Sequence, residues 1–575
     1  MGFDSGEILI RGAGARMVRN APAPKSAAPA SSKQTQHTQR RVEAAVYGVL
    51  FSAFSLVVAQ LFVLAAGRHT DIALAISEPV AATSFSRPDI VDRNGRLLAT
   101  DLEAPSIFAD PGLVLDRDEV VEKLSTVLPD LNSSELMRAL SDKSRRFVWV
   151  RRGVSPAIAQ KIHDLGLPGV SFRYELKRAY PGRKMAGHAL GYVDVDNRGV
   201  VGIEKYIDDK GGADPVHSAV LSSRPPVRLS LDIGVQHALE DELDEAMRRY
   251  QTEGAAGVVI NIKTGEILAS TSLPRVDPAW PTQALDDKRI DRMTGGTFEL
   301  GSVFKTLTLA MAFDEGLATP HTVLDVRQPL QVGRFTVSDM HPSRRPLTAK
   351  EVFTHSSNVG AGMLALQAGP EKWRGFLKKL GLLEQMHVET GAVAPPQVPP
   401  RWNKAEVITT SFGHGIAVSP LQFAAAVATL FNGGKRVYPT FLRKFDAGTA
   451  DGEAVIKAGT SRQMAELFRS NVADKDGTGG KADVPGYRVG GKTGTADIAS
   501  KGGYKANAVI SSFLAAFPTD DPQYLTFIVL FEPKGIPETK GQRTGGTNAA
   551  PVTGELIARV AGQLGVAPQI TVAGK

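Results

Sequence analysis

The sequence predicts a chain of mixed α and β structure, in two folded parts behind a single membrane-spanning helix. Three observations support this prediction: an uncharged apolar run at residues 44–66, a Pro-rich joint at Pro225 and Pro226, and a change of pattern across that joint. The length of 575 residues exceeds one ordinary domain, and the apolar and charged fractions of 42% and 22% are those of a folded protein.

The first 43 residues are a basic tail. They hold seven Lys or Arg against three Asp or Glu, so more than half of the chain's formal charge of +7 lies there. The tail is rich in Ala, Pro, Ser and Gln and has no periodic apolar face, a composition typical of disorder. We therefore predict a disordered leader at residues 1–43 and no nucleic-acid partner.

Residues 44–66, AAVYGVLFSAFSLVVAQLFVLAA, form the one long apolar run. These 23 residues carry no formal charge and suffice to cross a bilayer as one helix. Because the basic residues precede the run, the positive-inside rule puts residues 1–43 in the cytoplasm and the rest of the chain across the membrane. A cleaved signal peptide is the competing interpretation, because LAAG places small residues near the end of the run, as a cleavage site requires. Both the apolar run and the tail before it are, however, longer than is usual for a signal peptide.

Cysteine is absent, which excludes disulfides, thiol catalysis and a lipoprotein anchor. The 11 histidines show neither HxH nor HExxH spacing, so we predict no metal site. We also expect no cofactor.

The two folded parts are predicted at residues 67–225 and 226–565, followed by a short tail at 566–575. The first part mixes short β-type runs with turn signals, such as the Asn-Gly pair of DIVDRNGRLLATD, which predicts a hairpin. The second opens with the helical spacing of DIGVQHALEDELDEAMRRY and continues with two strand-like runs around the Thr-Gly pair of AAGVVINIKTGEILAST. Alternating helical and strand patterns to the end of this part predict a mixed α/β domain.

The stretch TGGTFELGSVFKTLTLAMAFDEG sets Ser302 and Lys305 three residues apart at the start of an apolar helical segment. A serine at a helix N-terminus lies beside free backbone N–H groups and a dipole that favours an oxyanion, and the residue three positions on shares its face. A lysine there is useful as a base only when its amine is neutral. Burial together with a second nearby cation would lower its pKa far enough.

A second cation is available in GYRVGGKTGTAD, which suits a strand whose edge lines a cleft. Lys492 and the hydroxyls of Thr493 and Thr495 could hold a carboxylate, and Gly494 would let a ligand backbone approach closely.

Ser356 and Asn358 belong to a third motif, in EVFTHSSNVGAGMLAL, and offer a hydroxyl for proton relay and an amide for binding substrate. Each motif alone is weak, because SxxK and SxN are each expected about two or three times by chance in a chain of this length. An N-cap serine and an ST-turn are then the ordinary interpretations. The three motifs occur in the order SxxK, SxN and KTG, separated by 54 and 136 residues. This combination favours a catalytic site over the ordinary interpretations of the single motifs.

With these motifs the chain resembles the penicillin-binding proteins, more narrowly the class B members of the FtsI type, the septal peptidoglycan transpeptidases. RPDIVDRNGRLLA and RAYPGRKMAGHALGYVDVDNRGVVGIEKYID are similar to the family's membrane-proximal stretch and its pedestal signature, and SFGHGIAVSPLQFAAAVATLFNGG also has a family counterpart. The resemblance implies a penicillin-binding transpeptidase fold of the β-lactamase-like serine acyltransferase type at 226–565. It also implies an elongated α/β pedestal of the dimerisation type at 67–225.

The resemblance further implies a role for each motif residue. Ser302 would attack the carbonyl between the two terminal D-alanines of a stem pentapeptide, with Lys305 as its base and Ser356 relaying a proton to the leaving amine. Asn358 would bind the donor amide. The terminal carboxylate would be held by Lys492, Thr493, Gly494 and Thr495. β-Lactams resemble the D-Ala-D-Ala end and would trap the serine.

Other functions stay open on the sequence. A serine β-lactamase shares all three motifs, although the ExxLN motif of class A enzymes is absent, and a non-catalytic β-lactam sensor or scaffold would keep the same fold. An elongation-type class B enzyme is a further alternative, although SSNVG is closer to the division type. A bifunctional class A enzyme is disfavoured because no EDxxFxxH-type glycosyltransferase motif follows the apolar run.

The resemblance also implies a location and partners. We expect a single-pass protein of the bacterial inner membrane with its N-terminus in the cytoplasm and its catalytic domain in the periplasm, at the septum. Its expected partners are an FtsW-type glycan polymerase and other divisome proteins.

Overall fold

The computed structural model describes residues 52–56, 86–210, 225–333, 335–445, 452–500 and 503–569. Residues 84–575 form one compact unit and residues 1–83 another, of which only the helical residues 52–56 are described. The predicted basic tail, most of the predicted membrane helix and the end of the predicted C-terminal tail therefore lie outside the described residues. Within these ranges, no helix is both long and apolar enough to cross a membrane.

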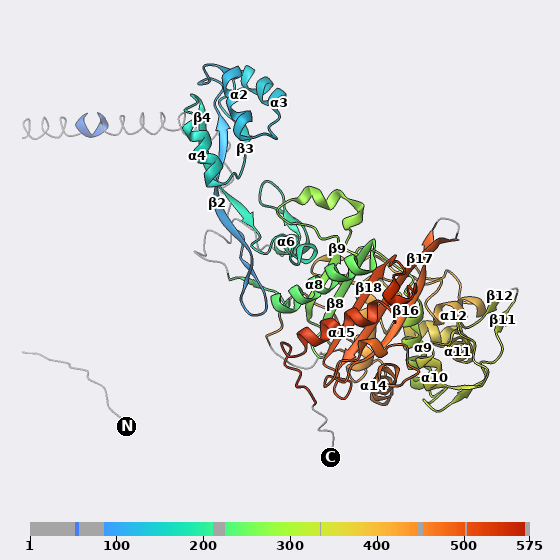
Figure 1. The fold of residues 1–575 in the computed structure, drawn as a ribbon. Helices are drawn as coiled ribbons and strands as arrows, with labels where there is room; N and C mark the ends of the chain where they lie inside the picture. The colour runs from blue at the N-terminus through green and yellow to red at the C-terminus, as the bar shows by residue number, and fades with distance from the viewer. Residues whose placement is uncertain are drawn as a thin grey trace, which may run out of the picture. The chain divides into compact units, whose positions relative to one another are not determined.

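The N-terminal part of the larger unit, residues 86–210, is built around the long strand β2 (Leu97–Ala109) (Figure 1). The predicted hairpin is present, with Gly95 in its turn at φ +85°, a left-handed conformation that favours glycine. The strands that pair antiparallel with β2 are β1 (Ile90–Val91), β3 (Val148–Arg151) and β4 (Val170–Ala179).

Short helices and one small strand pair complete this part. Helices α2, α3 and α4 enclose a separate small core that includes Ile107, Leu124, Leu136 and Ile162. The helices are α2 (Arg117–Val127), α3 (Ser133–Ser141), α4 (Pro156–Asp164), α5 (Gly187–Leu190) and α6 (Gly202–Asp209). The strand pair is β5 (Tyr192–Val193) with β6 (Gly199–Val201).

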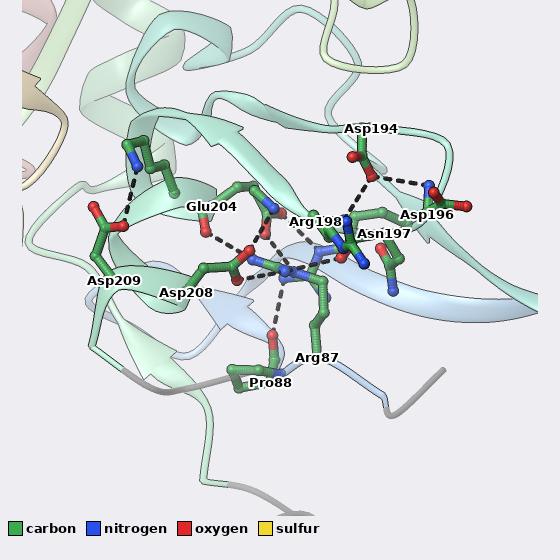
Figure 2. A network of polar contacts seen from close by, with 12 residues as sticks. Arg87, Pro88, Asp194, Asp196, Asn197, Arg198, Glu204, Asp208 and Asp209 are labelled. Carbon is green, nitrogen blue, oxygen red and sulfur yellow. Dashed lines mark hydrogen bonds and ion pairs between the residues drawn. The ribbon is translucent and has the colours of Figure 1, made fainter. Parts of the chain in front are cut away.

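A network of charged side chains is buried in the same part, and Figure 2 shows Arg87 lying among Glu204, Asp208 and Asn197. Arg87 Nε donates to Glu204 Oε2 at 3.0 Å and its Nη1 lies 2.6 Å from Asp208 Oδ1. Arg178 donates to Glu204 Oε1 at 2.7 Å and to Asp101 at 3.1 Å. Each guanidinium therefore faces two carboxylates, which compensates its charge in the interior.

Direct contacts join the two parts of the larger unit. Strand β7 (Val227–Arg228) pairs in parallel with β1, while residues 211–224, between the two parts, lie outside the described residues. The backbone N–H of Ala186 donates to Glu240 Oε1 at 2.9 Å, and the N–H of Ile233 donates to Asp92 Oδ2 at 3.2 Å.

The C-terminal part, residues 225–569, is organised by a five-stranded antiparallel sheet in the order β16-β17-β18-β8-β9. Along β17, Phe513 and Phe517 enter one core while Leu514 and Ala516 enter the other, because successive side chains of a strand point to opposite faces. Both faces of the sheet therefore need a helical cover. The strands are β8 (Gly254–Asn261), β9 (Ile267–Leu273), β16 (Gly490–Ser500), β17 (Gly503–Phe517) and β18 (Tyr524–Phe531).

Helices α8 (Ile233–Tyr250) and α15 (Ala549–Val560) cover one face (Figure 1). The other face is covered by α13 (Pro420–Phe431) together with α9 (Lys305–Asp314). Every residue of α9 is buried, so this helix is a fixed platform inside the domain. The other helices here are α10 (Ala349–Thr354), α11 (Asn358–Lys379), α12 (Lys404–Ser411) and α14 (Ala458–Ala473).

Within the described residues of the C-terminal part, three two-stranded ribbons lie outside the main sheet. They are β10 (Val323–Leu324) with β13 (Leu347–Thr348), β11 (Leu330–Val332) with β12 (Phe335–Val337), and β14 (His387–Val388) with β15 (Gly391–Ala392). The ribbons, the central sheet and the helices around it give the mixed α and β architecture that the sequence predicts.

Candidate active site

Ser302 lies on a short 3₁₀ turn, Gly301–Phe304, that leads directly into α9. Gly301 has φ +60°, and a Cβ at this position would lie only 2.4 Å from the carbonyl oxygen of Thr495. Glycine thus lets the segment with the serine pass directly against β16. Ser302 is partly exposed while α9 is buried, so the serine stands where the helix meets the surface.

Lys305, the first residue of α9, is completely buried, and its amine faces two serines. Its Nζ donates to Ser302 Oγ at 2.9 Å and lies 3.1 Å from Ser356 Oγ. It also donates to the backbone carbonyl of Ser356 at 2.5 Å. The predicted serine and lysine are therefore in direct contact, with a second hydroxyl beside them.

Lys492 brings the second cation to this cluster from β16, the edge strand of the sheet. Its Nζ lies 3.0 Å from Ser356 Oγ and 3.2 Å from the Thr493 carbonyl oxygen, and 5.6 Å from the centre of the Phe353 ring. The side chain is completely buried. Two lysine amines thus share one serine hydroxyl in an interior environment.

Burial lowers the pKa of Lys305 from 10.5 to about 7, against the opposing effect of the Asp339 carboxylate. Burial also lowers the pKa of Lys492 well below its usual value, and the charge of Lys305 adds to this effect. Neither amine forms an ion pair with a carboxylate among the described residues, so two positive charges here repel each other and only the effect of Asp339 on Lys305 opposes this. One amine of the pair can therefore be neutral near pH 7, as a base requires.

Ser356 adopts a backbone conformation with φ +59°, which is uncommon for residues other than glycine. In this conformation both its carbonyl oxygen and its hydroxyl face the amine of Lys305. Backbone strain of this kind persists where the surrounding structure imposes it, often at functional sites.

The side chain of Asn358 makes a contact that the sequence does not predict. Its Nδ2 donates to the backbone carbonyl of Ser338 at 3.1 Å, in the segment after β12. The next residue, Asp339, accepts from Ser357 Oγ at 2.6 Å and from the backbone N–H of Val359 at 3.0 Å, at the start of α11. No local sequence pattern marks Asp339, because it meets the motif only through the fold.

Thr493 and Thr495 are each held by neighbouring backbone or side chains. The hydroxyl of Thr493 lies 2.9 Å from that of Thr478, which donates to Asn471 Oδ1 at 3.0 Å. The hydroxyl of Thr495 accepts from the N–H of Gly545 at 3.2 Å. The sequence analysis did not single out Thr478, Asn471 or Gly545.

Gly494 is required by packing on the inner side of the strand. A Cβ there would lie 2.3 Å from Ser512 Oγ and 2.9 Å from the carbonyl oxygen of Leu300, in the segment before the serine. The sequence suggests instead that glycine makes room for a ligand backbone. The structure adds a reason internal to the protein.

Two family models match the chain. The Penicillin binding protein transpeptidase domain matches residues 255–558, and the Penicillin-binding Protein dimerisation domain matches residues 83–210. The chain belongs to the penicillin-binding protein transpeptidases. This confirms the resemblance seen in the sequence, and with it the fold of both parts of the larger unit.

Similar proteins agree with this membership. The chain is 40% identical to the probable peptidoglycan D,D-transpeptidase FtsI of Caulobacter vibrioides, over 84% of this chain and 82% of the relative. It is 28% identical to the peptidoglycan D,D-transpeptidase FtsI of Escherichia coli, over 86% of each chain.

Two solved structures resemble this penicillin-binding protein. Penicillin binding protein 3 of Mycobacterium tuberculosis, complexed with aztreonam, matches with a TM-score of 0.63 and 24% identity over 85% of this chain and 98% of that one. The transpeptidase domain of Burkholderia pseudomallei penicillin-binding protein 3 matches with a TM-score of 0.54 and 28% identity, over 60% and 98%.

Proposed function

We propose that this penicillin-binding protein is a septal peptidoglycan D,D-transpeptidase, which cross-links stem peptides through an acyl-enzyme on Ser302 and is inhibited by β-lactams. The chain aligns with two relatives named FtsI over most of their length, and the names of these relatives give the D,D-transpeptidase activity. The observation that carries the proposal is the buried amine of Lys305, 2.9 Å from Ser302 Oγ and 3.1 Å from Ser356 Oγ.

Acylation follows from this geometry. The neutral amine of Lys305 takes the proton of Ser302 as Oγ attacks the carbonyl between the two terminal D-alanines. The backbone N–H groups of Ser302 and Thr495 stabilise the oxyanion. Ser356, in contact with both lysines, passes a proton to the departing D-alanine amine.

Substrate binding is assigned to strand β16 and the SSN motif. Lys492, Thr493 and Thr495 hold the terminal carboxylate of the donor, beside Gly494, and the charge of Lys492 helps to keep Lys305 neutral. Asn358 binds the donor amide. To do so, its Nδ2 gives up the hydrogen bond to the Ser338 carbonyl and donates to the substrate instead. An amine of a second stem peptide then attacks the acyl-enzyme and closes the cross-link.

The cellular setting is part of the proposal. Residues 44–66 anchor the chain in the inner membrane, residues 1–43 remain in the cytoplasm, and residues 67–225 and 226–565 act as pedestal and catalytic domain in the periplasm. The uncharged run and the basic residues before it support this topology. An FtsW-type polymerase and other divisome proteins are the proposed partners, because an anchored transpeptidase needs new glycan strands at the membrane.

The test is a cross-linking reaction with the full chain in detergent and uncross-linked glycan strands that carry stem pentapeptides. We expect released D-alanine and cross-linked peptide dimers, both lost in Ser302→Ala. Hydrolysis of penicillin without dimers would instead identify a β-lactamase. Absence of both reactions would identify a sensor or scaffold.

A further inference from the structure

A second group of titratable side chains lies beside the serine segment and has no part in the mechanism above. Glu299, three residues before Ser302, is its centre. Glu299 Oε2 accepts from the hydroxyl of Tyr504 at 3.1 Å and lies 3.5 Å from His414 Nδ1, while Oε1 accepts from the N–H of Gly415 at 2.9 Å. Two distant parts of the chain, at residues 414–415 and at Tyr504, therefore converge on one carboxylate.

The loop that carries His414 is fixed against the nucleophile segment. The N–H of Gly301 approaches the Gly413 carbonyl oxygen at 3.4 Å, and a Cβ at Gly413 would lie 2.3 Å from the Gly301 carbonyl oxygen. The backbone N–H of His414 donates to the Thr409 carbonyl at 3.0 Å, at the end of α12. The backbone that carries His414 is thus held against Gly301, the residue that precedes Ser302.

The two ring nitrogens of His414 differ in their surroundings. Nδ1 lies 3.5 Å from Glu299 Oε2, whereas no hydrogen bond of Nε2 is found within the described ranges. The side chain is 28% exposed, so a ligand can reach it. A carboxylate on one side of an imidazole fixes its tautomer and leaves the other nitrogen as a base.

The reaction needs such a base in its second half. A stem-peptide amine is protonated at neutral pH and must lose protons before and during its attack on the acyl-enzyme. Lys305 and Lys492 are already engaged with Ser302 and Ser356 on the donor side.

We propose that His414, positioned by Glu299 and Tyr504, binds the acceptor amine and takes its proton when it attacks the acyl-enzyme, a step that rests on the function proposed above. The amine nitrogen forms a bond to the acyl carbon, and the bond from that carbon to Ser302 Oγ breaks. One amine proton passes to His414 Nε2, and the lysine pair supplies a proton to Ser302 Oγ. His414 then returns its proton to solvent, from which the lysine pair recovers one.

The charged groups around His414 agree with a base that is neutral at pH 7. Burial lowers its pKa below 6.5, Glu299 and Asp497 act in the opposite direction, and Lys305 lowers the pKa again. Tyr504 and Phe412 are the aromatic neighbours, with ring centres 6.1 and 5.5 Å away. The base form of His414 is lost as the pH falls through this lowered pKa, so aminolysis should weaken in acid.

The experiment separates the two halves of the reaction in the full chain. A D-alanyl thioester serves as donor and glycine as acceptor amine, and aminolysis and hydrolysis products are measured from pH 5.5 to pH 9, beside the rate of penicillin acylation. In His414→Gln we expect the ratio of aminolysis to hydrolysis to fall at least about tenfold, with acylation reduced less than about threefold. Glu299→Gln and Tyr504→Phe should lower the same ratio by smaller factors.

The matched control is His387→Gln, an exposed histidine of β14. An unchanged ratio in His414→Gln, or parallel loss of acylation and aminolysis, would overturn the inference, because the latter indicates a structural role. In the wild-type protein, a ratio that does not decline toward pH 5.5 would also overturn it. Loss of penicillin acylation in the wild type itself would instead count against the proposed function.

Discussion

Two buried clusters of charged side chains, among those of the described residues, differ in how their charges are balanced. In the N-terminal part, Arg87 and Arg178 face Glu204, Asp101 and Asp208 within 3.1 Å. Each positive charge there has a negative partner. Removing one member of such a cluster would leave a buried charge without its partner.

The candidate active site has the opposite composition. Lys305 and Lys492 are both completely buried and contact the same hydroxyl of Ser356. Burial without a carboxylate partner lowers the pKa of Lys305 to about 7. The comparison teaches that a balanced cluster gives stability, whereas an unbalanced one gives a neutral amine that can act as a base.

The largest expected effect is on the unbalanced cluster. Lys305→Met should slow acylation by penicillin by about 10²–10⁴-fold, because the base is lost. Stability should not fall with it, since the substitution removes a buried amine without a countercharge. Acylation is measured by intact mass and stability by urea unfolding; a rate within tenfold of wild type would remove Lys305 from its role.

The pH dependence of stability provides a control for this variant. In the wild type, the unfolded chain binds a proton at Lys305 up to pH 10.5, whereas the folded chain releases it near pH 7. The contribution of Lys305 therefore makes the folded state more stable as the pH rises from 7 to 10.5. Lys305→Met should lose this contribution.

A substitution in the balanced cluster should lower stability and leave the acylation rate unchanged, the reverse of the result expected for Lys305→Met. Glu204→Gln leaves Arg87 and Arg178 with fewer countercharges and should lower the free energy of unfolding by about 3–5 kcal/mol. The acylation rate per folded molecule should stay at the wild-type value. Urea unfolding and penicillin titration measure the two quantities, and a stable variant with slow acylation would contradict the contrast.

Removing one of the two cations should change the pH profile. In Lys492→Met the repulsion on Lys305 disappears, so the pKa of Lys305 rises and the acid limb of acylation moves to higher pH. The profile is measured with a penicillin from pH 5.5 to pH 10. If the acid limb of the acylation profile stays at the wild-type pH, once the weaker binding of penicillin by the variant is corrected for, the two amines do not interact.

The smallest effect is expected at Asp339, whose carboxylate raises the pKa of Lys305 against the effect of burial. Asp339→Asn should therefore move the same acid limb to lower pH, opposite to Lys492→Met. The variant should also lose about 1 kcal/mol of stability, because Asp339 accepts hydrogen bonds at the start of α11. A shift to higher pH would be inconsistent with this electrostatic account.

Local patterns in the sequence predict much of this structure. The Asn-Gly hairpin, the strands around Gly265 and the helix at α8 follow from turn chemistry and periodicity. The contact of Lys305 with Ser302 follows from a spacing of three residues.

Contacts between distant segments could not be predicted in this way. The bond from Asn358 to the Ser338 carbonyl and the approach of His414 to Glu299 depend on loops that only the folded domain brings together. For Gly494, local reasoning predicts a ligand-facing role, and the fold adds a packing reason, because an added Cβ would lie 2.3 Å from Ser512 Oγ. The sequence singles out Asn358 and Gly494 without indicating the residues that they contact, and it does not single out His414 or Glu299.

The most direct test of the central claim is the rate of penicillin acylation of the full chain as a function of pH, with the adduct mapped by peptide mass. We predict a stable adduct on Ser302 whose rate of formation rises with pH, with a midpoint near the Lys305 pKa of about 7. An adduct on another residue, or a rate that does not change between pH 5.5 and pH 9, would contradict the account.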